Sequence, residues 1–291
     1  MSGRAQRRTG ESGGHPALRR VVAAVAGAAV AQGTFAAMNA RQDDQSQWNR
    51  TNHRGETVSL LAGPSVAVGG ATGALLGGLG TRLGPTAFAT GITVGGLGVY
   101  DDIVGAREDQ RSSKGFKGHL GALREGQVTS GLVKILGIGS VGLLAGAAVS
   151  PRPVVRHPVD AVVNGGLVAG TANLFNLLDL RPGRAIKAGL LVGAPVLASA
   201  GGTSAAGAMG AATAMLPSDL AERTMLGDGG ANALGALLGL GIAAGAGRVV
   251  RTATLATVVG LTLASEKVSF TQVIESTPGL REVDGLGRRP R

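Results

Sequence analysis

Four aspartates are the residues in this sequence whose types and spacing could do chemistry. Asp101 and Asp102 end one long apolar segment, Asp179 ends a second, and Asp228 lies just before a third. Carboxylates at such boundaries are costly to desolvate unless they are paired or bound to a metal, and carboxylate oxygens are the ligands that Mg²⁺ takes in proteins. The four aspartates therefore predict a Mg²⁺ site on one face of the protein.

Glycines surround Asp228 in the stretch 227–230. They let backbone N–H groups approach an anion, and a helix that starts here would add its favourable dipole. A simpler interpretation also stands, because Asp228 could only cap that helix. Asp101 and Asp102 could likewise be plain interfacial charges, although the C-terminal end of a helix is electrostatically the wrong place for two anions.

Polar residues of other types accompany the aspartates. Asn173 and Asn176 lie one helical turn apart before Asp179, where they could join the site or form hydrogen bonds between helices. Arg54 and the basic stretch 107–124 could supply charge that binds phosphate. For the basic stretch, a solvated surface loop is the alternative.

The composition indicates the elements that must position these residues. The chain has 291 residues, of which 44% are hydrophobic, 16% charged, 2% aromatic and 51 are Gly, a balance that suits helices packed in lipid. The absence of Cys excludes disulfides and thiolate metal sites. The net charge of +10 suits anionic lipid or a phosphorylated substrate, whereas one Trp, one Tyr and five Phe argue against stacking on nucleic acid.

Nine apolar runs predict an all-α, polytopic transmembrane bundle with about nine spans. The runs are 21–38, 58–81, 85–100, 128–149, 159–178, 187–200, 203–216, 231–247 and 252–265. Several are shorter than the ~20 residues that a spanning helix needs. The domain boundaries follow as a basic segment 1–20, a membrane domain 21–265 and a polar tail 266–291. A cleavable signal peptide is the alternative for the first run.

Alternation of nine spans places the four aspartates on one side of the membrane. Of the 28 Lys and Arg residues, 18 fall on that side and 10 on the other, when Lys134 and Lys187 are assigned to the nearer membrane ends. The positive-inside tendency therefore predicts that the aspartate side is cytoplasmic. Five arginines between residues 4 and 20 fall on the other side, against this tendency.

Four segments, in order, resemble the motifs of the polyprenyl-phosphate glycosyl-1-phosphate transferases. They are Asn52-His-Arg-Gly55 with Val58 to Gly63, Gly98 to Asp102, Asn173 to Asp179, and Gly227 to Asn232 with Leu234-Gly235. The resemblance covers roughly residues 50–240. It implies a multi-helix enzyme of the plasma membrane that moves a sugar 1-phosphate from a UDP-sugar to polyprenyl phosphate, with Mg²⁺, in cell-envelope glycan synthesis.

The resemblance also implies roles for individual residues. Asp228 would be the main Mg²⁺ ligand. Of Asp101 and Asp102, one would activate the lipid phosphate and the other would support the metal, for which we choose Asp102. Asn176 and Asp179 would orient the nucleotide. Further contacts to phosphate would come from four polar residues: Asn52, Arg54, Lys114 and Lys117. A homodimer is an open expectation.

Two departures from the family pattern keep a second function class open. The third motif continues as Leu180 to Arg184 instead of Gly-x-Asp-Gly, and no histidine follows residue 157, where the family has a histidine-containing loop. The alternative to the enzyme is a non-catalytic relative that binds polyprenyl phosphate or scaffolds envelope-synthesis proteins. A small-solute transporter is a third possibility, but it would be expected to show inverted repeats, and no internal repeat is apparent.

Overall fold

A computed structural model describes residues 15–41, 46–106, 129–150, 153, 155 and 157–290. Within these residues the chain forms eleven α-helices, which confirms the all-α class. The helices are α1 (Pro16–Asn39), α2 (Ala62–Gly77), α3 (Leu83–Val104), α5 (Ser130–Ala148), α6 (Pro158–Leu178), α7 (Arg184–Leu197), α8 (Gly202–Leu220), α9 (Gly227–Gly245), α10 (Arg248–Ser265), α11 (Phe270–Ser276) and α12 (Leu280–Gly285).

Each of the nine apolar runs in the sequence coincides with one of the helices from α1 to α10. Local signals set several of their starts. Pro16 and Pro158 occupy the first positions of α1 and α6, where a missing N–H costs nothing. The hydroxyl of Thr129 caps α5 by accepting a hydrogen bond from Leu132 N at 3.2 Å. Helix α2 begins later than its apolar run because residues 57–59 form a strand.

Three helices, α1, α5 and α6, are long and apolar enough to cross a membrane. The pair α10 and α11, bent by 99°, is a fourth candidate. Several other helices are too short to pass this test, which explains part of the difference between these candidates and the nine predicted spans. Helix α7 has 14 residues, which at 1.5 Å each span about 21 Å, less than the ~30 Å hydrocarbon layer. Three helices, or four with the bent pair, are thus candidates to cross a membrane by length and composition, and the number nine stays a prediction.

Helix α9 forms the centre of the bundle. It contacts α2, α3, α5, α6, α7 and α8, and almost every residue along it is buried. Small residues make this packing possible. A Cβ at Gly98 of α3 would collide with the backbone of Asp228 in α9, so glycine at this position brings the two helices together at the aspartates.

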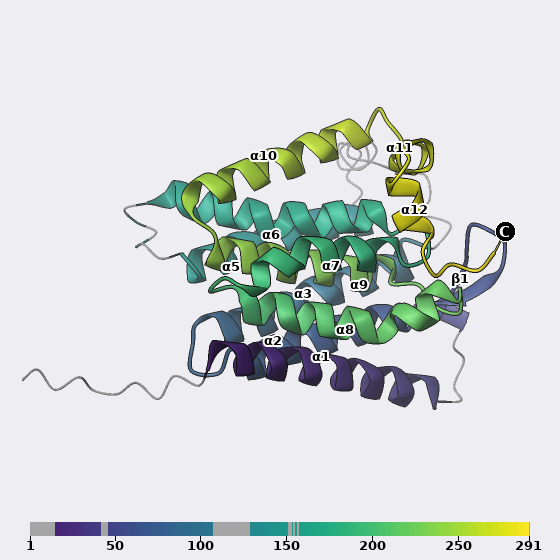
Figure 1. Ribbon diagram of the computed structural model, residues 1–291, viewed down its shortest axis with the longest axis horizontal. Helices are drawn as coiled ribbons and strands as arrows, with labels where there is room; N and C mark the ends of the chain where they lie inside the picture. The colour runs from purple at the N-terminus through teal and green to yellow at the C-terminus, as the bar shows by residue number, and fades with distance from the viewer. Residues whose placement is uncertain are drawn as a thin grey trace, which may run out of the picture.

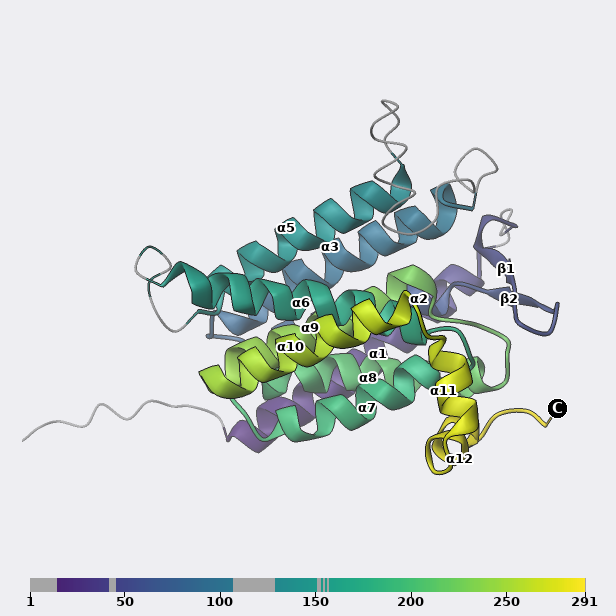
Figure 2. The same ribbon diagram turned by 90° about the horizontal axis from the view of Figure 1, so that it is seen from above.

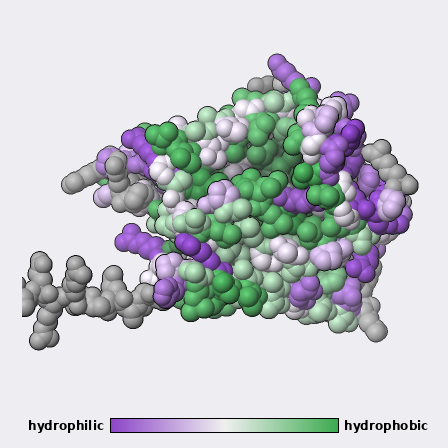
Figure 3. Space-filling view, in the orientation of Figure 1, coloured by the Kyte–Doolittle hydropathy of each residue, from purple (hydrophilic) through white to green (hydrophobic). Residues whose placement is uncertain are grey.

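The polar connections gather at the two ends of the bundle (Figure 1). The end that carries the aspartates also holds a two-stranded antiparallel hairpin, β1 (Asn49–Thr51) and β2 (Thr57–Ser59), in which Arg50 faces Val58. Helices α11 and α12 lie at this same end in both ribbon views (Figure 2). Hydrophobic residues cover much of the middle of the face in Figure 3, whereas hydrophilic residues concentrate near this end.

Candidate functional site

The structure brings Asp101 and Asp228 together around a lysine. Asp101 lies near the end of α3, Asp228 at the start of α9, and Lys134 near the start of α5. Lys134 Nζ is 2.6 Å from Asp101 Oδ2 and also forms an ion pair with Asp228 Oδ2. The three side chains are only 15–24% exposed. The two carboxylates therefore converge on one cationic group at the junction of three helices.

Asp102 faces the backbone of α9. Its Oδ1 accepts a hydrogen bond from Asp228 N at 3.1 Å, and its Oδ2 accepts one from Gly229 N at 3.0 Å. Gly227 has φ of 59°, a conformation that favours glycine, and this turn directs both N–H groups at the carboxylate. The backbone N–H groups that the sequence predicted to approach a bound anion are occupied here by the carboxylate of Asp102, so the predicted binding of phosphate to them stays a prediction. Arg50 additionally donates to the Asp102 carbonyl oxygen.

These contacts explain how the C-terminal end of α3 carries two anions. The helix dipole is unfavourable for negative charge at that end. Asp101 is compensated by the ammonium group of Lys134, and Asp102 by the N-terminal end of α9. Both aspartates thus have specific partners, which a plain interfacial charge would lack.

Asp179 adjoins this cluster from α6, directly after the helix ends. Its Oδ2 is buried and has no hydrogen-bond partner, although the residue as a whole is partly exposed. Burial raises the pKa of Asp179 well above its ordinary value, and the nearby Asp219 raises it further, against a hydrogen bond from the Gly227 backbone. Asn176 lies one turn earlier on the same helix. A buried carboxyl oxygen without a hydrogen-bond partner suits recognition of a hydrogen-bonding ligand.

Asn52 and Arg54, in the connection between α1 and α2, contact Glu222. Glu222 lies in the connection between α8 and α9. Asn52 Nδ2 donates to Glu222 Oε2 at 2.8 Å, and Arg54 Nε lies 3.0 Å from Glu222 Oε1. Glu222 is buried and has φ of 55°, which is unfavourable for a residue with a side chain. This glutamate was not predicted from the sequence, nor was Lys134, because each meets its partners only through tertiary contacts.

A cavity of about 360 Å³ lies between these groups, lined by residues that include Asp179, Asp219, Glu222 and Met225. Asp219 holds the turn beside it, because its Oδ2 accepts a hydrogen bond from Gly183 N at 2.5 Å. Of the three carboxyl groups that line this cavity, Asp219 and Glu222 are bonded to protein groups, whereas Asp179 Oδ2 has no hydrogen-bond partner. The cavity could hold the neutral, hydrogen-bond-donating part of a ligand.

Two of the residues predicted to bind phosphate, Lys114 and Lys117, lie outside the described residues. Within the described part of the chain, no three His, Asp or Glu side chains lie close enough to hold a metal ion by themselves. The predicted roles of Asp102 and Asp228 as Mg²⁺ ligands therefore stay predictions. No protein-family model matches this sequence, and no curated protein is detectably similar to it.

Proposed function

We propose that this protein is a plasma-membrane transferase that moves a sugar 1-phosphate from a UDP-sugar to polyprenyl phosphate. The observation that carries the proposal is the meeting of Asp101, Asp102, Asp228 and Lys134 at one end of an apolar helical bundle. In this proposal the helices from α1 to α10 form a polytopic bundle in the membrane, and the end with the aspartates faces the cytoplasm, where UDP-sugars are made.

The reaction needs two phosphate-bearing anions to approach each other. An oxygen of polyprenyl phosphate attacks the phosphorus attached to the sugar, and the bond from that phosphorus to the oxygen of the UMP group breaks. The sugar 1-phosphate becomes part of a lipid diphosphate, and UMP leaves with the electron pair. Most of the catalysis in such a transfer comes from positioning and charge neutralisation, so a site that combines fixed carboxylates with a cation is suited to it.

Asp228 would hold Mg²⁺ together with Asp101, because these two carboxylates converge on Lys134. This differs from the sequence-based choice of Asp102 as the second ligand, because both oxygens of Asp102 already accept hydrogen bonds from the backbone of α9. Mg²⁺ is commonly bound by one or two carboxylates together with substrate phosphates and water, so two converging carboxylates are a sufficient protein contribution. Their fit to a cation is supported by the ammonium group that they already share. When bound, Mg²⁺ supplies neutralisation of the diphosphate. Lys134 would then turn its ammonium group to a phosphate oxygen.

Asp102 has the role of a positioning residue in this proposal, because both of its oxygens accept backbone hydrogen bonds from the first turn of α9. Asn176 and Asp179 would orient the nucleotide, with the base in the 360 Å³ cavity. Asn52 and Arg54 would close that cavity through their contacts with Glu222.

The test is UMP release by the purified chain supplied with polyprenyl phosphate, Mg²⁺ and each of several UDP-sugars. We expect release by the wild-type protein and its loss on chelation of Mg²⁺. Asp228→Asn should lower the rate by at least about a hundredfold, since it removes a charge that acts on the reacting phosphates. Glu266→Gln, an exposed carboxylate beyond α10, is the matched control and should leave the rate unchanged. Equal rates for Asp228→Asn and wild type would refute the proposal.

A non-catalytic relative is the second candidate, because Lys134 already neutralises the two carboxylates. It predicts binding of polyprenyl phosphate with no UMP release from any UDP-sugar. The same assay therefore separates the two functions.

A further inference from the structure

The end of the bundle opposite the aspartates carries arginines that the proposed function does not use. Helix α1 begins at this end, away from the hairpin (Figure 1). Its first turns contain Arg19 and Arg20, two of the five arginines that run against the positive-inside tendency in the predicted topology. An anionic partner at this end would explain their position.

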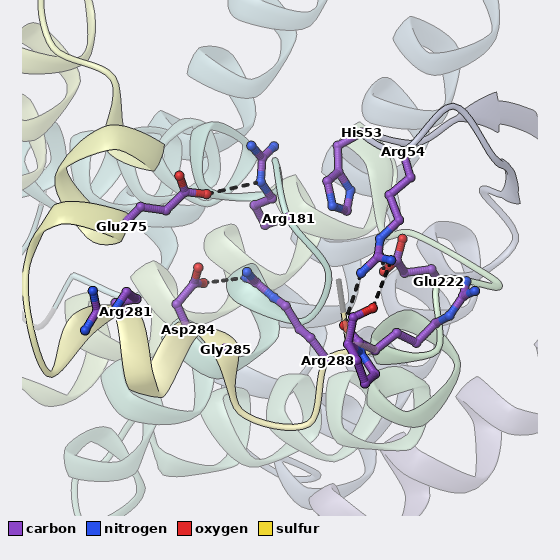
Figure 4. A pocket seen from close by; sticks show the side chains of 11 residues that line it. His53, Arg54, Arg181, Glu222, Glu275, Arg281, Asp284, Gly285 and Arg288 are labelled. Atoms are coloured by element: carbon purple, nitrogen blue, oxygen red, sulfur yellow. Dashed lines mark hydrogen bonds and ion pairs between the residues drawn. The ribbon is translucent and has the colours of Figure 1, made fainter.

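These two arginines differ from those at the aspartate end. There the C-terminal segment, residues 266–290, helps to line a cavity of about 970 Å³, and each of its five arginines pairs with a carboxylate (Figure 4). Among the described residues, the carboxylate at the opposite end is Asp160, which pairs with Arg248 and Arg251 of α10. Arg19 and Arg20 thus have no carboxylate partner in the described part of the chain.

Both arginines line a cavity of about 490 Å³ between the start of α1, the start of α3 and the connection from α7 to α8. Arg20 spans one side of it, because its Nη2 donates to the Ser199 carbonyl oxygen at 3.2 Å. Gly202 leaves room for this contact, since a Cβ there would lie 2.7 Å from Arg20 Nε. The guanidinium group of Arg19 forms no hydrogen bond within the described residues. Three hydroxyl residues also line the cavity: Thr81, Ser199 and Thr203.

A smaller apolar cavity, of about 140 Å³, adjoins the first, and Arg19 lines both. It lies between α1 and the end of α2. The helices approach closely here, because a Cβ at Gly77 would lie only 2.5 Å from the Arg19 carbonyl oxygen. Exposed apolar side chains form the rest of its wall: Leu18, Val22, Leu76 and Leu79. An apolar groove therefore continues directly from the cavity that holds the arginines.

The outer surface of α1 extends this groove. Helix α1 is the least buried of the three candidate spans, and it packs mainly against α2 and α8. Val21 and Val25 are exposed on it. In a membrane, such a surface contacts acyl chains, and basic residues at its end lie near the headgroups. Guanidinium groups match phosphate oxygens with parallel N–H donors. A ligand that joins a phosphate to a hydrocarbon chain would fit both cavities.

We propose that these two cavities bind an anionic phospholipid from the leaflet opposite the aspartates. Arg19 and Arg20 bind its phosphate group, and the groove between α1 and α2 holds part of an acyl chain. The inference rests on the membrane placement in the proposed function and on none of its chemistry. The lipid is a membrane component, distinct from the polyprenyl phosphate that reacts at the aspartate end.

Native mass spectrometry of the full chain in a non-ionic detergent tests this site. The probes are phosphatidylglycerol and phosphatidylcholine, with glycerol 3-phosphate and polyprenyl phosphate as competitors. Arg19→Ala removes the charge, Arg19→Lys keeps it, and Val22→Trp fills the groove. Arg248→Ala is the matched control, because it removes an exposed arginine at the same end that lines neither cavity. Thermal unfolding without lipid verifies that each variant is folded.

We expect the wild type and Arg248→Ala to bind phosphatidylglycerol about tenfold more tightly than phosphatidylcholine, whose choline group adds a positive charge beside the arginines. Arg19→Ala should lose most of this preference, because one charge-assisted hydrogen bond is worth about a factor of ten, and Arg19→Lys should retain it. Val22→Trp should weaken binding of both lipids. Equal affinities of the wild type for the two lipids, an unchanged preference in Arg19→Ala, or unchanged binding by Val22→Trp would overturn the inference.

The competitors and one further variant separate this site from other sources of phosphate. If glycerol 3-phosphate displaces phosphatidylglycerol as well as a lipid does, the site holds a soluble anion and the inference is wrong. It is also wrong if polyprenyl phosphate displaces the phospholipid from the wild type but not from Arg19→Ala. Asp228→Asn should bind phosphatidylglycerol like the wild type, so the lipid site can stand where the transferase fails, and the reverse.

Discussion

Asp102 holds Asp228 through the protein backbone, because its Oδ1 accepts a hydrogen bond from the Asp228 N–H at 3.1 Å. The side chain of Asp228 is thereby left to Lys134, and the paired aspartates of α3 divide their roles. Asp101 shares the cation, and Asp102 fixes the helix that carries Asp228. The adjacent aspartates 101 and 102 are therefore not equivalent.

Replacing Asp102 by Asn should impair the site by loosening the backbone that holds Asp228 in position. An amide can accept only one of the two backbone hydrogen bonds and directs its NH₂ group at the other N–H. We expect a stability loss of about 2 kcal/mol and a marked fall in the rate of UMP release. Thermal unfolding and the release assay measure these effects. A variant with full stability and full rate would show that these hydrogen bonds do not position Asp228.

Removing the charge of Lys134 should make the thermal stability of the protein depend on a divalent cation. Lys134→Met leaves Asp101 and Asp228 close together without their cation, and an uncompensated buried charge costs roughly 3 kcal/mol. We expect a lower melting temperature in a chelator and its partial recovery in Mg²⁺. Recovery should be absent in Lys134→Met combined with Asp228→Asn. Equal melting temperatures with and without Mg²⁺ in the single variant would argue against a metal at these carboxylates.

Acid should loosen the C-terminal segment. Burial alone would raise the pKa of Asp284, but hydrogen bonds and charge from Arg184 and Arg288 outweigh it and hold this pKa below its ordinary value. The ionised carboxylate therefore stabilises the fold above its unfolded-state pKa, and this contribution is lost as the pH falls through the lower folded-state pKa. Melting temperatures should fall below about pH 4, and Asp284→Asn should flatten that part of the profile.

The stability of Asp284→Asn at neutral pH gives a second check. Breaking a buried, bidentate pair should cost about 3 kcal/mol, because Arg184 is left without its partner. Proteolysis after residue 265 should also become faster in this variant. An unchanged cleavage rate would mean that the pair does not fix the segment.

Two glycines of α3 provide a matched test of helix packing. A Cβ at Gly98 would collide with the backbone of Asp228 and Gly229, whereas nothing lies within 4 Å of one at Gly96. Gly98→Ala should therefore destabilise the protein by about 2 kcal/mol and reduce activity, because α3 must move away from α9. Gly96→Ala should be neutral or slightly stabilising in thermal unfolding. Similar effects of the two substitutions would contradict the close contact at Gly98.

The sequence predicted the helices well because apolar runs separated by polar or glycine-rich turns leave the backbone few alternatives. All nine runs became helices, and the aspartates at their ends met at one end of the bundle. The same pattern could not predict that Lys134 pairs with Asp228, 94 residues away. From the sequence, Lys134 was interpreted as a charge at a membrane end. Its role depends on the packing of α5 beside α3.

The C-terminal segment marks the other limit of prediction. Its apolar residues have no regular spacing, and contacts with distant residues, such as the pairing of Asp284 with Arg184, 100 residues away, give it a place in the fold. The cavity beside this segment, lined by residues that include Arg54, Arg181 and Arg288, arises from three segments that are not neighbours in the chain. Such a cavity has no local sequence motif.

The most direct measurement of the central claim is mass spectrometry of lipids after the purified protein is incubated with polyprenyl phosphate and UDP-sugars. The account predicts a polyprenyl diphosphate sugar and an equal amount of UMP, formed with Mg²⁺ by wild type and Glu266→Gln but not by Asp228→Asn. Absence of this lipid for every UDP-sugar, or its undiminished formation by Asp228→Asn, would contradict the account.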